Sequence, residues 1–236
     1  MCIPLLALSD RGYSGLPLTS SRVGAADSWE DLGEVISHLR KTHPLLPLFA
    51  IGYSMGGQML AKYLSVASQK GRGDRLPELE AAVTVSAPYD LSSHMRHLEA
   101  GPKEGVVNAI ITSLAKLQLL GHLFSSSARK HLAAVDVKGA ATALSLRAME
   151  RALVCPLHGY RSPEEYYESA RPVVPNIDTP LLMVHARDDP VIRVEDLPMD
   201  QLRANKQVRV VISPRGGHLG WASNPFPGGP SWVDDL

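Results

Sequence analysis

The 236-residue sequence contains only two cysteines, and their positions exclude two classes of protein. Cys2 and Cys155 lie far apart and outside any metal-ligand spacing, so neither a disulfide framework nor a zinc site is indicated. Two histidines, His94 and His97, could share a helix face, but no further ligands lie nearby in the sequence. We therefore expect no cofactor and no metal, and a reduced compartment fits the cysteine content.

The sequence also lacks an excess of charge and a long apolar run. Basic and acidic residues number 24 each, so the formal net charge is zero. There is consequently no electrostatic reason to expect nucleic acid or an anionic membrane as a partner. The apolar start, residues 1–8, is too short for a signal peptide or a membrane span. We expect a cytoplasmic protein, or a membrane-associated one if an anchor precedes residue 1.

Short apolar runs alternate with helical patterns along most of the chain, which predicts an α/β fold with a parallel sheet. Apolar periodicity predicts helices that start after Asp27 or Ser28 and at Met55. The predicted strands lie at residues 3–9, 47–50, 81–86, 180–185 and 208–212.

Residues 91–171 have helical patterns and little strand signal. We interpret this range as a helical lid inserted into the α/β domain and folded over its site. An ordinary bundle of packing helices is the alternative.

The segment from Gly52 to Gly56 reads Gly-x-Ser-x-Gly between a predicted strand and a predicted helix, the context that marks a nucleophile elbow. A turn this sharp leaves no room for a Cβ, so we expect glycine to be required at both Gly52 and Gly56. Ser54 would then stand clear for attack. The helix behind it would direct its positive end at the site, with the Met55 N–H as an oxyanion donor.

A serine nucleophile needs a base and a group that orients the base. Two acids, Asp188 and Asp189, follow a predicted strand, and His218 lies in a glycine-rich loop after the last one. The order Ser, Asp, His is that of α/β-hydrolases. We favour Asp189 as the acid, because the residue before the proline usually carries this role in related loops. Asp188 is the alternative acid, and we expect it to cap or hydrogen-bond the turn.

As an ordered set, these motifs resemble one branch of the α/β-hydrolases. The branch contains plant embryogenesis-associated hydrolases, yeast medium-chain acyl-ester synthase/esterases and mammalian abhydrolase-domain lipases. The similarity extends from residue 5 to about residue 221 and also rests on the segments 10–15, 159–162 and 186–190. It implies one partial α/β-hydrolase domain over residues 1–236.

The resemblance implies a serine carboxylester hydrolase for acylglycerols, phospholipids or simple fatty-acyl esters, with no cofactor. Its partner would be a small acyl ester or lipid, and not nucleic acid. One alternative is an acyltransferase or ester synthase that uses the same triad. Another is a catalytically impaired fragment that serves as a binding module. Peripheral membrane contact and the oligomeric state stay open.

Members of this branch have upstream strands and a His-Gly loop that supplies the second oxyanion N–H, and the sequence contains no match for them. In the sheet order that the resemblance implies, the strand before that loop lies between residues 3–9 and the nucleophile strand. Its loss would remove an interior strand. Because one oxyanion donor contributes about a hundred- to a thousandfold in turnover, we expect a truncated chain with little esterase activity.

Overall fold

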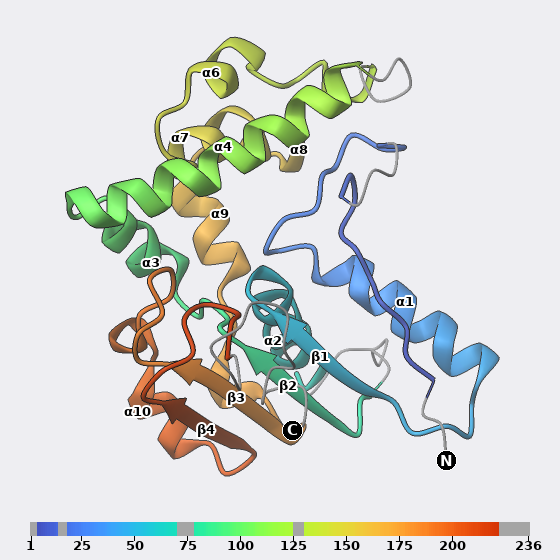
Figure 1. Cartoon of the computed structure of the whole chain (residues 1–236). Helices are drawn as coiled ribbons and strands as arrows, with labels where there is room; N and C mark the ends of the chain where they lie inside the picture. The colour runs from blue at the N-terminus through green and yellow to red at the C-terminus, as the bar shows by residue number, and fades with distance from the viewer. Residues whose placement is uncertain (1–3, 14–17, 70–77, 125–129, 222–236) are drawn as a thin grey trace. The chain divides into compact units, whose positions relative to one another are not determined.

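The computed structural model describes residues 4–13, 18–69, 78–124 and 130–221 (Figure 1). The chain divides into two compact units. We call Met1–Ala25 with Gly105–Tyr166 the helical unit, and Ala26–Glu104 with Tyr167–Leu236 the sheet unit.

The sheet unit contains a four-stranded sheet in the order β1-β2-β3-β4, with every neighbouring pair parallel. Tyr53 lies opposite Val85, and Val85 lies opposite Val184. The carboxyl ends of the first three strands therefore meet at one edge of the sheet (Figure 1). This confirms the predicted α/β fold with a parallel sheet. The strands are β1 (Phe49–Tyr53), β2 (Ala81–Val85), β3 (Leu181–Ala186) and β4 (Val208–Ser213).

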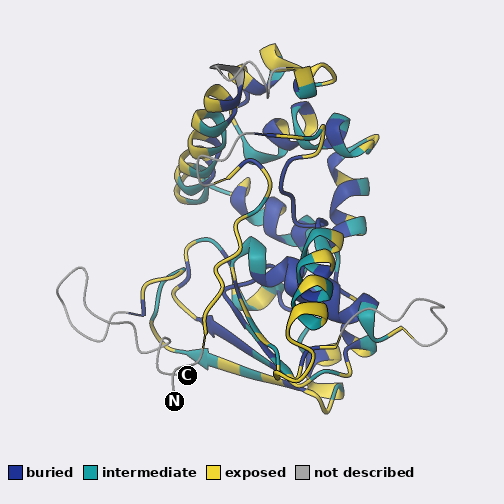
Figure 2. Cartoon of the chain, turned by 90° about the vertical axis from the view of Figure 1, so that its right-hand side faces the viewer, coloured by how far each residue is buried: buried dark blue, intermediate teal, exposed yellow. Residues whose placement is uncertain are grey.

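One face of this sheet forms the main core. Leu60 and Leu64 of one helix pack there with Leu181 and Met183 of β3, and Figure 2 shows such buried residues in dark blue. The first helix begins at Trp29, as predicted, with Ser28 at the N-cap position. The helices of the unit are α1 (Trp29–Thr42), α2 (Met55–Ala67), α3 (Leu91–Leu98) and α10 (Met199–Ala204), with 3₁₀ turns at Val174–Asn176 and Val194–Asp196.

The opposite face of the sheet is covered unevenly. Val85 and Val184 pack against the buried indole of Trp221. The outer strand β1 instead exposes alternate apolar side chains, and Phe49 is 66% exposed and Ile51 58% exposed. The nucleophile strand is thus the edge of the described sheet, with one apolar face open to solvent.

The prediction of a strand over residues 3–9 is wrong for residues 4–9, which form no regular structure and are exposed. A strand is stable only when a neighbour satisfies its N–H and C=O groups, and no described strand pairs with this segment. Residue 3 and Cys2 lie outside the described residues.

The helical unit is built around the long helix α4 (Pro102–Phe124). The described residues between 91 and 171 contain helices and no strand, as their pattern indicates. That this part acts as a lid stays a prediction. Its other elements are a 3₁₀ turn (Lys130–Leu132), α6 (Val137–Thr142), α7 (Leu146–Ala152), α8 (Val154–His158) and the first half of α9 (Pro163–Ala170), whose second half belongs to the sheet unit.

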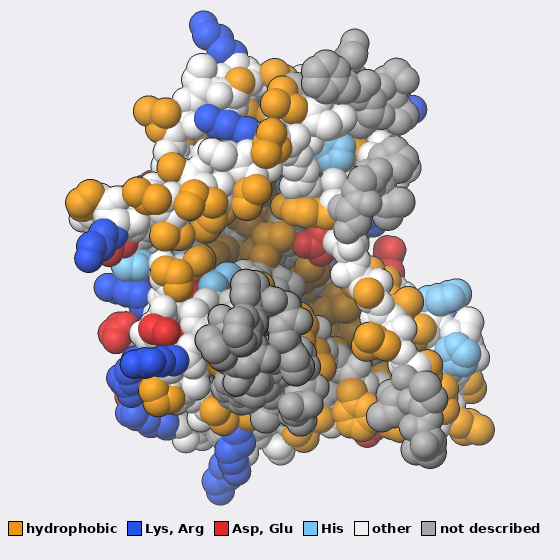
Figure 3. All heavy atoms as spheres, viewed as in Figure 1, with side chains coloured by type: hydrophobic (Ala, Val, Ile, Leu, Met, Phe, Trp, Pro, Cys, Tyr) orange, Lys and Arg blue, Asp and Glu red, His pale blue; other side chains and the backbone are white. Residues whose placement is uncertain are grey.

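Helix α4 buries polar residues and exposes apolar ones. Its buried Asn108 accepts a hydrogen bond from the Leu146 N–H at 2.8 Å, and the buried Thr112 hydroxyl donates to the Asn108 carbonyl at 2.7 Å. Within the described residues, no helix has the length and apolarity needed to span a membrane. The exposed apolar side chains follow α4 in Figure 3 and include Val106, Ile110, Leu114, Leu117 and Leu120.

Candidate active site

Ser54 lies between the last residue of β1 and the first residue of α2. Its φ of 51° lies in the left-handed region, which is strained for a residue with a side chain. The Ser54 N–H donates to the Val85 carbonyl at 2.8 Å, and the Ser54 carbonyl accepts from the Gln58 N–H at 3.1 Å. The sheet and the helix therefore hold the strained turn from both sides.

The glycines around Ser54 differ in how closely other atoms approach them. A Cβ on Gly52 would lie 2.6 Å from the Gly56 carbonyl oxygen, and one on Gly57 would lie 2.8 Å from the Gly52 carbonyl oxygen. A Cβ on Gly56 would meet no described atom within 4 Å. The expectation for Gly52 is confirmed and that for Gly56 is wrong, because β1 approaches the helix at Gly57.

The first turn of α2 follows Ser54 and contains no acidic residue. The first N–H groups of a helix have no partner within the helix, and the helix dipole adds positive character at this end. The N–H of Met55, the first residue of α2, is one of these groups. This end of α2 suits an oxygen that carries negative charge.

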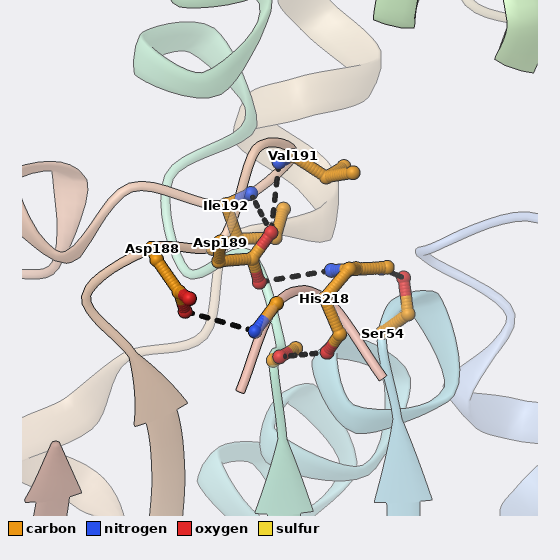
Figure 4. A network of polar contacts seen from close by, with 8 residues as sticks. Ser54, Asp188, Asp189, Val191, Ile192 and His218 are labelled. Carbon is orange, nitrogen blue, oxygen red and sulfur yellow. Dashed lines mark hydrogen bonds and ion pairs between the residues drawn. The ribbon is translucent and has the colours of Figure 1, made fainter. Parts of the chain in front are cut away.

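His218, the predicted base, lies next to both Ser54 and an acid (Figure 4). Its Nε2 lies 2.9 Å from the Ser54 Oγ, and its Nδ1 lies 2.9 Å from the Asp189 Oδ2. The imidazole is 21% exposed and the Asp189 carboxylate 1% exposed. The structure therefore places the three residues singled out from the sequence in one chain of hydrogen bonds.

The orientation of Asp189 is fixed by the turn that follows it. Its other oxygen, Oδ1, accepts hydrogen bonds from the Val191 N–H at 2.8 Å and the Ile192 N–H at 2.9 Å (Figure 4). With Oδ1 held by the backbone, Oδ2 is directed at His218.

Asp188 binds the histidine loop rather than the histidine ring. Its Oδ1 accepts a hydrogen bond from the Gly217 N–H at 2.9 Å. Gly217 has a φ of 60°, which glycine adopts without strain. The two adjacent acids thus hold adjacent residues, since Asp188 holds the loop backbone and Asp189 the imidazole.

Ser86 is a residue of this site that the sequence analysis did not single out. It directly follows β2, is fully buried, and has a φ of 50°. Its hydroxyl donates a hydrogen bond to the backbone carbonyl of His218. The only sequence signal was a polar residue at the end of a strand, which has many ordinary explanations.

Two further histidines lie buried near the acid and the base. Neither ring nitrogen of His185 has a hydrogen-bond partner among the described residues, and the Nδ1 of His94 has none among them either. Burial lowers the pKa of each to about 4, although the nearby Asp189 carboxylate opposes this and His218 adds to it. Both imidazoles are therefore neutral at pH 7. No group of three or more His, Cys, Asp or Glu side chains in the described part of the chain could hold a metal ion.

The chain matches one protein family and is similar in sequence to several known proteins. The family model described as serine aminopeptidase, S33, matches residues 12–219. A Saccharomyces cerevisiae monoacylglycerol lipase is 28% identical over 81% of this chain and 42% of its own length. The human phospholipase ABHD3 is 26% identical over 97% of this chain and 54% of its own. The chain therefore spans about half the length of these relatives.

Among solved structures, Candida antarctica lipase A in its closed state is similar to this chain. It matches with a TM-score of 0.49 and 14% identity, over 83% of this chain and 51% of the lipase.

We predict that Gly52→Ala and Gly56→Ala differ sharply in stability. The added methyl at position 52 would lie against backbone that cannot move aside, so the free energy of unfolding should fall by about 1–3 kcal/mol. At position 56 the methyl is unobstructed and alanine favours the helix, so stability should be unchanged or up to about 1 kcal/mol higher. Urea denaturation followed by circular dichroism measures both. Equal losses in the two variants would contradict this account of the elbow.

We also predict that buried histidine makes the protein sensitive to acid. Below its ordinary pKa of 6.5, His185 takes up a proton in the unfolded chain but not in the folded one, where the pKa is about 4. Stability is therefore complete above pH 6.5 and falls as the pH drops toward 4, by roughly 3 kcal/mol for this residue.

His185→Leu should keep or raise stability at pH 7, since it removes buried nitrogens without partners. It should also reduce the loss between pH 7 and pH 4.5, and His94, whose pKa is likewise lowered to about 4, should contribute a similar share in both proteins. Urea denaturation at both pH values tests this, with the exposed His38→Gln as control. A loss in His185→Leu as large as that in the unmodified protein would refute the prediction.

Proposed function

This chain belongs to the serine aminopeptidase S33 family of α/β-hydrolases, and we propose that it is a serine hydrolase that cleaves carboxylic esters of acyl lipids. The observation that carries the proposal is the chain of two 2.9 Å contacts that joins Ser54, His218 and Asp189. A serine hydroxyl becomes a nucleophile when a base accepts its proton and a third group orients that base. The three positions meet these requirements.

In the first half of the reaction, the Ser54 Oγ attacks the ester carbonyl carbon while His218 Nε2 takes the hydroxyl proton. Asp189 accepts the Nδ1–H bond, which fixes the tautomer and stabilises the imidazolium that forms. The Met55 N–H donates to the oxyanion of the tetrahedral intermediate. His218 then gives its proton to the departing alkoxide, and the acyl group stays on Ser54.

In the second half, His218 accepts a proton from water as the water oxygen attacks the acyl carbonyl. Collapse of the second tetrahedral intermediate releases the fatty acid, and the proton returns from His218 to Ser54. Every proton moves between the substrate, water and these side chains, so the mechanism requires no cofactor.

The proposal of an acyl-lipid substrate rests on two observations. The similar yeast and human proteins are a monoacylglycerol lipase and a phospholipase. Helix α4 exposes a row of apolar side chains from Val106 to Leu120, and such patches mark surfaces for apolar ligands or membranes. We infer that this row contacts acyl chains or the surface of a lipid aggregate.

We predict that Ser54→Ala abolishes covalent labelling by a fluorophosphonate probe and the low rate of p-nitrophenyl butyrate hydrolysis expected with the Met55 N–H as oxyanion donor, because the attacking oxygen is gone. Labelling is read by in-gel fluorescence, with circular dichroism to show that the variant is folded. An amino-acid p-nitroanilide serves as the peptidase substrate and should be cleaved much more slowly than the ester. Failure of the folded unmodified protein to label at Ser54 would overturn the proposed function.

The two adjacent acids should respond very differently to removal of their charge. Asp189→Asn should lower the labelling rate by about 10³–10⁴, because the amide no longer holds the reactive tautomer of His218. Asp188→Asn keeps an oxygen that can accept from the Gly217 N–H, so its rate should stay within about tenfold of the unmodified protein. The opposite order of rates would assign the acid to Asp188.

A further inference from the structure

We propose that Ser86 is a positioning residue that fixes the catalytic base relative to the nucleophile. This inference rests on the proposed function, because it assigns a role within the same reaction. The Ser86 hydroxyl bonds the backbone carbonyl of His218 rather than its imidazole. Its effect on catalysis would therefore pass through His218.

Two consecutive residues at the end of β2 hold both partners of the proton transfer. The Val85 carbonyl accepts from the Ser54 N–H at 2.8 Å, and the Ser86 hydroxyl donates to the His218 carbonyl. The Ser86 N–H itself donates to the Val184 carbonyl of β3 at 2.9 Å. The end of β2 is therefore fixed to the sheet on both sides, and it ties together two residues that lie 164 positions apart.

The Ser86 bond completes the restraint of the histidine loop. Asp188 holds the Gly217 N–H, and the Gly216 carbonyl accepts from the Trp221 N–H at 2.9 Å. The Ser86 hydroxyl adds a third hydrogen bond to this loop, at the His218 carbonyl, between Gly217 and Trp221. Once the backbone of His218 is fixed and Asp189 holds Nδ1, little freedom remains for Nε2, the atom that meets Ser54.

The conformation of Ser86 supports this role. Its φ of 50° is unfavourable for a residue with a Cβ, and glycine would adopt it without strain. Strain of this kind persists where the surroundings hold it, and it is concentrated at functional sites. A serine at this position has a less favourable backbone conformation than glycine would have, but it supplies a hydroxyl, which glycine lacks.

The test compares Ser86→Gly and Ser86→Ala with the unmodified chain. Both variants remove the hydroxyl, and glycine also relieves the backbone strain, so Ser86→Gly should fold. We expect the rate of fluorophosphonate labelling and the kcat for p-nitrophenyl butyrate to fall by about ten- to hundredfold in both, with KM nearly unchanged. Misplacement of the base affects proton transfer and leaves ester binding intact.

A matched control separates positioning from general loss of a buried hydroxyl. Ser65 is also fully buried in the sheet unit, and its hydroxyl donates to the Lys62 carbonyl at 2.8 Å, within α2. Ser65→Ala should retain the labelling rate of the unmodified protein. A second measurement is the proton resonance of His218 Nδ1–H, assigned by its loss in His218→Gln. It should shift or broaden in Ser86→Gly and stay in place in Ser65→Ala.

The outcomes separate this inference from the proposed function. If the unmodified protein labels and Ser86→Gly labels at the same rate with an unshifted His218 resonance, the positioning role is refuted and the proposed function stands. If the folded unmodified protein does not label, the proposed function fails and this inference fails with it. A slower Ser86→Gly beside an unaffected Ser65→Ala supports both.

Discussion

The site depends on the parallel register of β1, β2 and β3. In this register Tyr53, Val85 and Val184 lie side by side; β1 and β2 end there, and β3 continues to Ala186, opposite Ser213 of β4. The Ser54 N–H and the Ser86 N–H extend the ladder by one bond beyond each pair. A slip in register between β1 and β2 would move Ser54 away from Ser86, since each of them directly follows the last residue of its strand.

Two residues with side chains adopt positive φ at this edge, Ser54 and Ser86. Each follows directly on a strand, and each is held by hydrogen bonds to a neighbouring strand. The strain, typically about 1–3 kcal/mol per residue, persists because these hydrogen bonds hold the backbone in place. Close approach of β1 to α2 at Gly52 and Gly57 is part of the same arrangement.

The buried polar groups of the site and those near it differ in whether they have hydrogen-bond partners. Asp189 is almost completely buried and accepts three hydrogen bonds, whereas His185 is buried without a partner among the described residues. A buried imidazole avoids the larger cost of a buried charge by staying neutral. The carboxylate thus has neutral neighbours in His94 and His185, and the side chain that bonds it is that of His218.

The sequence by itself determined the α/β class, the strands that begin at Ala81 and Val208, and the candidate residues Ser54, Asp189 and His218. These follow from local patterns, because strand periodicity and the residues at a strand end are read within one short stretch. Only the tertiary structure decided that Gly57 is crowded and Gly56 is not, that Asp188 holds Gly217, that Ser86 holds His218, and that residues 4–9 form no strand. Each of these depends on which backbone lies beside the residue in space, and segments that bond across 132 positions, as Ser86 and His218 do, leave no trace of their pairing in either local pattern.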